Sequence, residues 1–234
     1  MTERSPAGET PGSGTEGRIR RAATRREVIP GLVLDEDLYG AAAEGLAAHA
    51  PGQPALTWEA FTDPARWWLV PGPDDDDFGV PVGYKAEFVV TQTASLTIKI
   101  NVWYRPDLRS AETSRPHTHP WEVMEAHPVL GGYEDQHWHR SASGLLVEQG
   151  SVLNVPGAVN RIFARDYHEV TAIADPGRTV SVMICGRWIH DDAKQGVWGH
   201  LDLHTGEHVP VERDEAEQAR FRSRLYRINP QHAA

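Results

Sequence analysis

Residues 95–105 read Ser-Leu-Thr-Ile-Lys-Ile-Asn-Val-Trp-Tyr-Arg, so that apolar side chains occupy every second position. Successive side chains of an extended strand point to opposite faces of a sheet. The alternation therefore predicts a half-buried β-strand. One face carries Leu96, Ile98, Ile100, Val102 and Tyr104, and the other carries Thr97, Lys99, Asn101, Trp103 and Arg105.

Short segments of the same kind follow this stretch and are separated by turn-forming pairs such as Gly131-Gly132 and Pro176-Gly177. Short strands at this density are typical of a β-sandwich or a β-barrel. The 17 prolines and 21 glycines also argue against a helical bundle. The sequence thus predicts an all-β fold, with strands at 121–129, 133–140, 144–149, 151–155, 168–174, 179–186, 198–203 and 206–211.

Helices are predicted at both ends of this β-rich body. Asp35 is a helix-capping residue that precedes apolar side chains at helical spacing as far as Ala50. Asp63-Pro64 predicts the start of a second, short helix that leads into Trp67 and Trp68. Helical periodicity returns over residues 214–228, which indicates a C-terminal helix.

These elements predict one folded domain preceded by a tail. Residues 1–28 offer little apolar surface to bury and carry five arginines between Arg18 and Arg26, so we expect a disordered segment. Residues 29–234 are expected to form the single domain, whose first part, 29–70, is the helical segment. No change of composition in this range indicates a linker between domains.

Composition narrows the classes of function. The net charge of −10 and the pI near 5.6 disfavour a nucleic-acid surface, because phosphate binding needs clustered basic residues. Cys185 is the only cysteine, so an intrachain disulfide is excluded. No segment resembles a secretory signal or a membrane span. We expect a cytoplasmic protein that binds neither nucleic acid nor membrane.

The most informative motif is Pro116-His117-Thr118-His119-Pro120-Trp121. The two imidazoles are two residues apart, so in an extended chain they project from the same face and can hold one metal ion. Two histidines on a strand face can equally be surface residues. The wider sequence context therefore has to support the metal site.

That context resembles the cupin family. Its first motif is His-x-His followed by Glu and Gly, and its second is Gly, Pro and a later His. The matching residues here are His117, His119, Glu122, Glu125 and Gly131-Gly132 for the first motif, and Gly150, Pro156-Gly157 and His168 for the second. The resemblance covers about residues 95–187. It implies a double-stranded β-helix, or jelly-roll, barrel with flanking N- and C-terminal helices and one bound metal ion.

The sequence departs from the cupin pattern in two places. The family glutamate would fall at position 123 or 124, so neither Glu122 nor Glu125 is in register, although alternation puts Glu125 on the face of His117 and His119. Asn160-Arg161 stands where the final histidine is expected, and His168 appears later. The sequence that follows His168, at residues 176–186, resembles the thiol-dioxygenase branch, which implies iron held by His117, His119 and His168 without a carboxylate. A four-ligand site with Glu125 is the alternative.

Three further residues are candidate catalytic groups. Arg105 could pair with a substrate carboxylate, Tyr167 could hydrogen-bond dioxygen or an anion, and Glu125 could act beside the metal. His127 is either a pocket contact or a core residue. His137 and His139 form a second His-x-His pair, which is the alternative metal site.

A three-histidine site leaves coordination positions open for oxygen and substrate. We therefore expect a mononuclear non-haem Fe(II) oxygenase or dioxygenase acting on a small polar metabolite, either amino-acid-like or a thiol. Imidazole also suits zinc and other divalent ions, so a non-redox isomerase, lyase or ligase-like enzyme is the alternative. A cupin that senses a small ligand without catalysis is the third hypothesis. The expected partners are a small-molecule substrate, dioxygen and, in a homodimer, a second copy of the chain.

Overall fold

The structure is a computed structural model that describes residues 24–75, 81–108, 114–141, 143, 145–189, 198–210 and 215–232. Most of the predicted disordered tail, 1–28, lies outside the described residues. Its last residues belong to strand β1 (Arg25–Ile29), which pairs with β2 (Leu32–Asp35).

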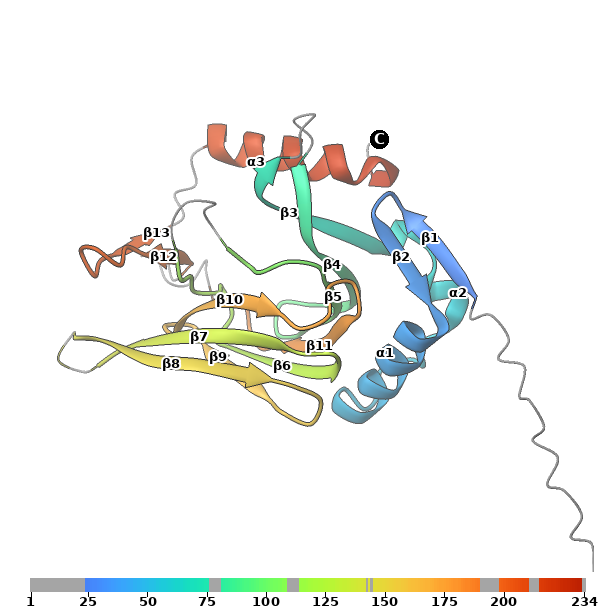
Figure 1. Cartoon of the computed structure of the whole chain (residues 1–234), viewed down its shortest axis with the longest axis horizontal. Helices are drawn as coiled ribbons and strands as arrows, with labels where there is room; N and C mark the ends of the chain where they lie inside the picture. The colour runs from blue at the N-terminus through green and yellow to red at the C-terminus, as the bar shows by residue number, and fades with distance from the viewer. Residues whose placement is uncertain are drawn as a thin grey trace, which may run out of the picture.

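Two antiparallel sheets make up the body of the protein (Figure 1). The larger sheet has the strand order β3 (Trp67–Asp75), β4 (Pro81–Gln92), β5 (Thr97–Trp103), β11 (Thr179–Cys185), β6 (Val123–Leu130) and β9 (Asn160–Phe163). The smaller sheet has the order β10 (Tyr167–Ile173), β7 (Tyr133–Arg140) and β8 (Leu146–Asn154). The fold is thus mostly β. Among the described strands, backbone pairing does not join the two sheets into a closed barrel.

The remaining elements lie around these sheets. Helix α1 (Glu36–His49) packs on β11 and β6, and α3 (Glu215–Ile228) lies across β3 and β4. The short helix α2 (Trp58–Phe61) and the 3-10 turn Pro64–Arg66 precede β3, and a second 3-10 turn, Pro230–His232, follows α3. The hairpin of β12 (Gly199–Leu201) and β13 (His208–Pro210) completes the fold.

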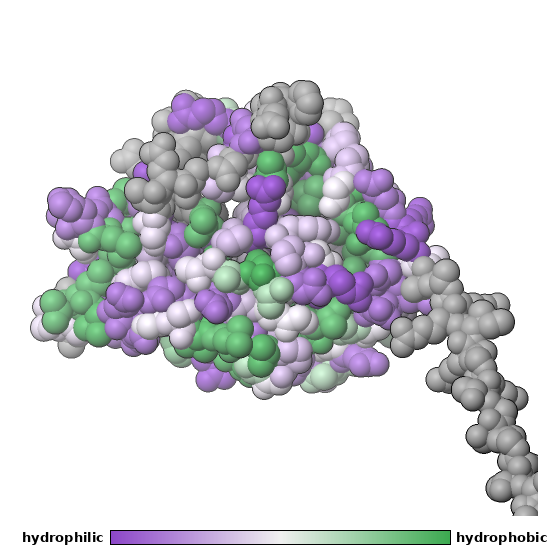
Figure 2. Space-filling model, in the orientation of Figure 1, coloured by the Kyte–Doolittle hydropathy of each residue, from purple (hydrophilic) through white to green (hydrophobic). Residues whose placement is uncertain are grey.

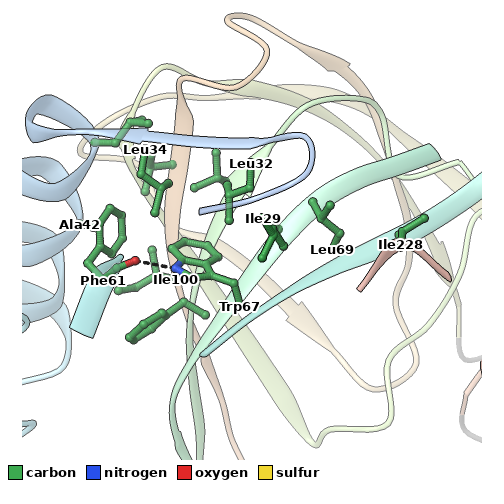
Figure 3. Close-up of a cluster of buried hydrophobic side chains, with 14 residues drawn as sticks. Ile29, Leu32, Leu34, Ala42, Phe61, Trp67, Leu69, Ile100 and Ile228 are labelled. Atoms are coloured by element: carbon green, nitrogen blue, oxygen red, sulfur yellow. Dashed lines mark hydrogen bonds between the residues drawn. The ribbon is translucent and has the colours of Figure 1, made fainter. Parts of the chain in front are cut away.

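One face of the larger sheet packs on the N-terminal segment and forms the main hydrophobic core (Figure 3). Trp67 is fully buried there, and its indole Nε1 donates a hydrogen bond of 2.6 Å to the backbone oxygen of Phe61. The alternation of apolar residues in β5 predicted which of its side chains would be buried on this face. The prediction is confirmed for Ile100 and Val102, which belong to the same core cluster as Trp67. Asp35 caps α1 as predicted, because its side chain accepts a hydrogen bond from Leu38 N.

The opposite face of the larger sheet looks towards the smaller sheet. Trp103 of β5 stacks on Tyr133 of β7, with 5.6 Å between ring centroids. The residues at alternate positions on β5 share this face, so Lys99 and Asn101 lie on the side of the sheet that faces β7 and β10. The polar interior between the two sheets contains the candidate site.

Two predicted strands, 144–149 and 151–155, are a single strand, β8. Gly150 lies in its middle with a positive φ of 91°, and the pairing register with β7 shifts between His137 and Trp138. Gly adopts such a backbone conformation without steric cost, and this combination is typical of a β-bulge. The break in the strand pattern at Gly150 therefore marks a bulge within one strand and not a turn between two strands.

Strand β8, at the edge of the smaller sheet, exposes large apolar side chains. Figure 2 shows apolar side chains interspersed with polar ones on the face that carries β7 and β8. Exposed large hydrophobic residues of this strand are Val147, Val152 and Leu153. The homodimer stays a prediction.

Within the described residues, no helix has the length and apolarity needed to span a membrane.

Candidate metal centre

His117 and His168 are brought together by their own backbones. His117 N donates to His168 O at 2.9 Å, and His168 N donates to His117 O at 3.0 Å. Residues that exchange both hydrogen bonds in an antiparallel pair sit directly opposite each other, with their side chains on the same side. This pairing places the two imidazoles side by side, with 4.7 Å between ring centroids.

His119 completes the group from two residues further along the chain. Its Nε2 lies 2.7 Å from His168 Nε2, and its ring centroid lies 4.9 Å from those of His117 and His168. The three candidate ligand nitrogens all lie within 4.8 Å of one another. Neighbouring nitrogens bound to one ion at ordinary metal–nitrogen lengths are about 3 Å apart, so only small side-chain movements are needed to hold an ion.

The segment that carries His117 and His119 is fixed from behind by β12. Thr118 N donates to Gly199 O at 2.9 Å, and Gly199 N donates to Thr118 Oγ1 at 3.0 Å. A side chain at position 199 would collide with His208 and Val209, because a Cβ there would lie 2.4 Å from atoms of both residues. Glycine therefore allows β12 to pair closely with β13 while its backbone bonds the segment that carries His117 and His119.

Asp135 of β7 orients the imidazole of His168. His168 Nδ1 lies 2.9 and 3.0 Å from the two carboxylate oxygens, and Asp135 is completely buried. Burial raises the pKa of Asp135, but the adjacent His168 and His137 outweigh it and hold that pKa well below the ordinary range. The ionised carboxylate favours the tautomer with a proton on Nδ1, which leaves Nε2 free for a metal.

A second buried carboxylate lies beside His117. Asp107 Oδ2 is 3.5 Å from His117 Nε2, and both side chains are almost fully enclosed. Asp107 is held in place because its backbone N donates to Val170 O of β10 at 3.0 Å. Buried Glu169, next to His168 in the chain, accepts hydrogen bonds from Ser114 Oγ and Arg115 N. It thus holds the residues that lead into His117.

The composition of the cluster fits a divalent ion. Three imidazoles without a carboxylate suit iron, zinc, copper or nickel, and they leave coordination positions for other molecules. Two of the three, His117 and His168, are buried, and His119 is partly exposed, so the site has one open side. A buried three-histidine cluster of this kind suggests a divalent metal.

The structure does not bring Glu125 to this cluster. Its carboxylate pairs with Arg161 on the neighbouring strand β9, at 2.7 Å from Nε, and lies 3.6 Å from His127 Nε2. Strand β6 begins only at Val123, so alternation does not run unbroken from His117 to Glu125. The interior positions of β6 are instead Met124 and Ala126. The catalytic role of Glu125 stays a prediction. The other candidate glutamate, Glu122, is exposed and lies beside Arg187.

Arg105 and Tyr167 also lie apart from the three histidines. Tyr104 N and Arg105 N both donate to Tyr84 O, so the strand alternation ends at Trp103. Arg105 lines a different cavity of about 420 Å³. Its other lining residues are Pro30, Gly31, Leu69, Val82, Gly83, Tyr104, Arg227, Ile228 and Pro230.

Tyr167 belongs to a small apolar cluster with Trp138 and Leu201, and its hydroxyl lies 3.0 Å from His208 Nδ1. Burial raises the pKa of Tyr167, so the phenol stays protonated near neutral pH. It precedes His168 on β10, and adjacent strand residues point to opposite faces. Catalytic roles for Tyr167 and Arg105 therefore stay predictions.

The other candidate histidines take different positions. His137 Nε2 lies 3.3 Å from Asp135 Oδ2, so it shares the carboxylate that holds His168. His139 pairs with Asp166 at the surface, and its side chain is 51% exposed. His127 stacks on His49 of α1, on the side of β6 away from the interior. Among the described residues, these three are not part of the cluster.

Sequence reasoning missed Asp107 and Asp135. Asp135 was detectable in principle, because it is an acidic residue at an inward position of a strand, two residues before His137. Asp107 has no such signal, since it follows the last residue of β5 in an irregular segment.

Comparisons with known proteins add a partial structural likeness. No protein-family model matched the sequence, and no curated protein matched it either. Among solved structures, KdgF from Halomonas sp. is 19% identical over 47% of this chain and 84% of its own, with a TM-score of 0.33. A putative mannose-6-phosphate isomerase from Ralstonia eutropha JMP134 is 15% identical over 46% of this chain and 91% of its own, with a TM-score of 0.34. Fe(II)-HppE with an alternative substrate is 15% identical over 53% of this chain and 57% of its own, with a TM-score of 0.33. Scores of this size do not define a family, and the case for a metal site rests on the three imidazoles.

Proposed function

We propose that this chain is a mononuclear metal-dependent enzyme of the cupin type, and that it uses Fe(II) to oxidise a small polar metabolite, amino-acid-like or a thiol. The observation that carries the proposal is the convergence of His117, His119 and His168, whose ligand nitrogens lie within 4.8 Å of one another. The resemblance of the sequence to three-histidine cupins supports iron over the other divalent ions.

The ligands have separate tasks in this proposal. His117, His119 and His168 would hold the ion through neutral imidazole nitrogens, and Asp135 keeps the proton of His168 on Nδ1. When bound, ferrous iron supplies redox chemistry and the coordination positions that three ligands leave open. Thr118 holds the His117–His119 segment at a fixed distance from β12.

The interior beside the histidines provides a mixed environment for a substrate. Met124 and Met183 form an apolar cluster on the larger sheet together with Ile162 and Cys185. Lys99 and Asn101 lie on the same face of that sheet and supply polar groups. Apolar walls exclude water, and a small number of polar groups fix the orientation of a ligand.

Oxygen consumption tests the redox assignment. Purified protein is reconstituted with Fe(II) without oxygen and then mixed with oxygenated buffer and a panel of amino acids, small thiols and small organic acids. At least one substrate class should give oxygen uptake that His168→Ala abolishes and that the surface variant His139→Ala retains. The variant His139→Ala is the matched control because its histidine also pairs with an aspartate, Asp166.

Three results would contradict the iron proposal in different ways. Stoichiometric zinc with no oxygen uptake would favour the non-redox isomerase, lyase or ligase-like alternative, in which the ion acts as a Lewis acid. A ligand-induced rise in melting temperature without turnover would favour the sensing alternative. Oxygen uptake that persists in His168→Ala would show that the three histidines do not carry the reaction.

A further inference from the structure

We propose that the interior beside the three histidines binds the anionic group of its substrate through Lys99, so that the substrate is a small molecule with a carboxylate or phosphate group. This inference rests on the proposed function, because it names the substrate class of the same site. It is carried by the placement of the lysines, by their ion pairs and by an unpaired buried amide.

The lysines are few, and two of them lie at this site. The chain has 23 basic residues, of which only Lys85, Lys99 and Lys194 are lysines. Lys85 of β4 and Lys99 of β5 lie on the face of the larger sheet that looks towards the smaller one, because Lys85 pairs in register with Trp103 and Lys99 is four residues from it. Two of the three lysines of this acidic protein thus lie inside the fold, on the face that looks towards the smaller sheet.

One carboxylate serves both ammonium groups. Glu87 Oε1 lies 3.0 Å from Lys85 Nζ, and Glu87 Oε2 lies 2.7 Å from Lys99 Nζ. Burial raises the pKa of Glu87, but Lys99 and Lys85 outweigh it and lower that pKa to about 2. Glu87 is therefore ionised near neutral pH and pairs with both ammonium groups.

The two lysines differ in how well they are satisfied. The ammonium of Lys85 lies over the rings of Tyr84 and Trp103 and is attracted by Asp107 as well as by Glu87. Lys99 Nζ hydrogen-bonds only Glu87 within the described parts of the chain, and an ammonium has three donors. Lys99 is thus the group with capacity for a ligand, and Lys85 keeps Glu87 in position.

Lys99 is connected to the metal centre through Trp121. Its Nζ lies 5.4 Å from the centroid of the Trp121 ring, which is 6.0 Å from the ring of His119. Lys99 and Trp121 are both only partly buried, as is His119. Trp121 thus lies between the ammonium group of Lys99 and the imidazole of His119, and a ligand that packs along its ring would extend from one group towards the other.

Asn101 provides an independent sign that a ligand belongs here. It is completely buried, on the same face as Lys99, and its Oδ1 has no hydrogen-bond partner among the described residues. Its Nδ2 donates to the sulfur of Met183 at 3.8 Å, the one partner that the described part of the chain gives it. An unpaired buried carbonyl is costly, so a ligand hydroxyl or amine that donates to it would stabilise the site.

The alternative is that Lys85, Glu87 and Lys99 only stabilise the fold. Buried ion pairs are often no more stabilising than apolar residues of similar size, because desolvation offsets their attraction. Ion pairing alone leaves donors of Lys99 unused, because its Nζ hydrogen-bonds only Glu87 among the described residues. A ligand anion would accept hydrogen bonds from these donors.

Isothermal titration calorimetry tests the inference with defined probes. Succinate, neutral succinamide and inorganic phosphate are each titrated into chelator-treated and into metal-loaded full-length protein. Wild-type protein should bind at least one of the two anions and should not bind succinamide. Whether succinate or phosphate binds more tightly tells which anionic group the site takes.

Variants distinguish anion binding through Lys99 from a general effect of the protein's charge on anion affinity. Lys99→Met should weaken anion binding about tenfold or more, as expected for the loss of a hydrogen bond to a charged group, and Lys99→Arg should restore most of it. The matched control is Arg161→Met, which removes a positive charge from the opposite side of the larger sheet, where Arg161 pairs with Glu125. This control should bind the anions like the wild type.

The outcomes distinguish this inference from the metal assignment. Full metal content with no anion binding by wild-type protein overturns the anion subsite and leaves the metal site standing. Anion binding that depends on Lys99 in a protein that takes up no metal supports the subsite and overturns the proposed function. Equal binding of succinate and succinamide by the wild type overturns the inference even if Lys99→Met fails to fold.

Discussion

The Nδ1 of His168 lies 2.9 and 3.0 Å from the two carboxylate oxygens of Asp135, in the enclosed space between the two sheets. This pair links the metal-binding strand β10 to its neighbour β7. Asparagine at position 135 keeps an acceptor oxygen but removes the charge, so the Nδ1–H tautomer is favoured less. We predict that Asp135→Asn lowers metal affinity about 10- to 100-fold, measured by competition with a chelator.

A matched variant is Asp166→Asn, because Asp166 also accepts from a histidine, His139, but at the surface. Its metal affinity should equal that of the wild type. Equal affinities for Asp135→Asn and the wild type would contradict the role assigned to Asp135.

The three histidines should be individually indispensable. His117→Ala, His119→Ala and His168→Ala each remove one of three ligands, so we predict that none of them retains a stoichiometric ion after gel filtration in buffer with a weak chelator. His139→Ala should retain it, since its imidazole lies at the surface. Loss of the ion in His139→Ala, or its retention in His168→Ala, would mean that the ligands are assigned incorrectly.

Glu125→Gln should have little effect on metal binding, because Glu125 pairs with Arg161 on the face of β6 away from the interior. The lost ion pair is partly exposed to solvent, so the free energy of unfolding should fall by less than about 1 kcal/mol. Metal content by mass spectrometry and a urea titration measure the two effects. A metal-free Glu125→Gln protein would restore the four-ligand alternative.

The ion pairs of Glu87 should make the free energy of unfolding depend on pH. The folded-state pKa of Glu87 is lowered from 4.5 to about 2 by Lys99 and Lys85 against the effect of burial. A depressed carboxyl pKa contributes stability above pH about 4.5, and this contribution is lost as the pH falls towards 2.

Urea titrations of metal-free wild-type and Glu87→Gln protein at several pH values check this expectation. Above pH 5 the variant should be less stable than the wild type, by up to about 3 kcal/mol. The difference should shrink as the pH falls from about 4.5 towards 2. A difference that does not change with pH would show that Glu87 is not held in its ionised form by the two lysines.

Much of the fold was predictable from local periodicity. The strand pattern of residues 97–103 and the helix after Asp35 follow from side-chain alternation and capping, which are properties of short segments. The pairing of strands was not predictable in this way. The bridge between His117 and His168 joins residues 51 positions apart, and no local pattern records such a contact.

The candidate metal site, like the fold, was predictable from the sequence only in part. The motif His117-Thr118-His119 indicates two ligands, and the family resemblance supplied His168. The predicted role of Glu125 depended on alternation across residues 117–125, and the irregular backbone before Val123 interrupts that alternation. Asp107 was missed because it acts from an irregular segment after β5, where side-chain direction cannot be counted from the sequence.

Metal content of the untagged, full-length protein tests the central claim most directly. Inductively coupled plasma mass spectrometry should find about one divalent ion per chain in protein that was purified without chelator or reconstituted with Fe(II). The double variant His117→Ala/His168→Ala should contain essentially none. A wild-type protein that folds normally but retains no ion after exposure to Fe(II) or Zn(II) would contradict the account.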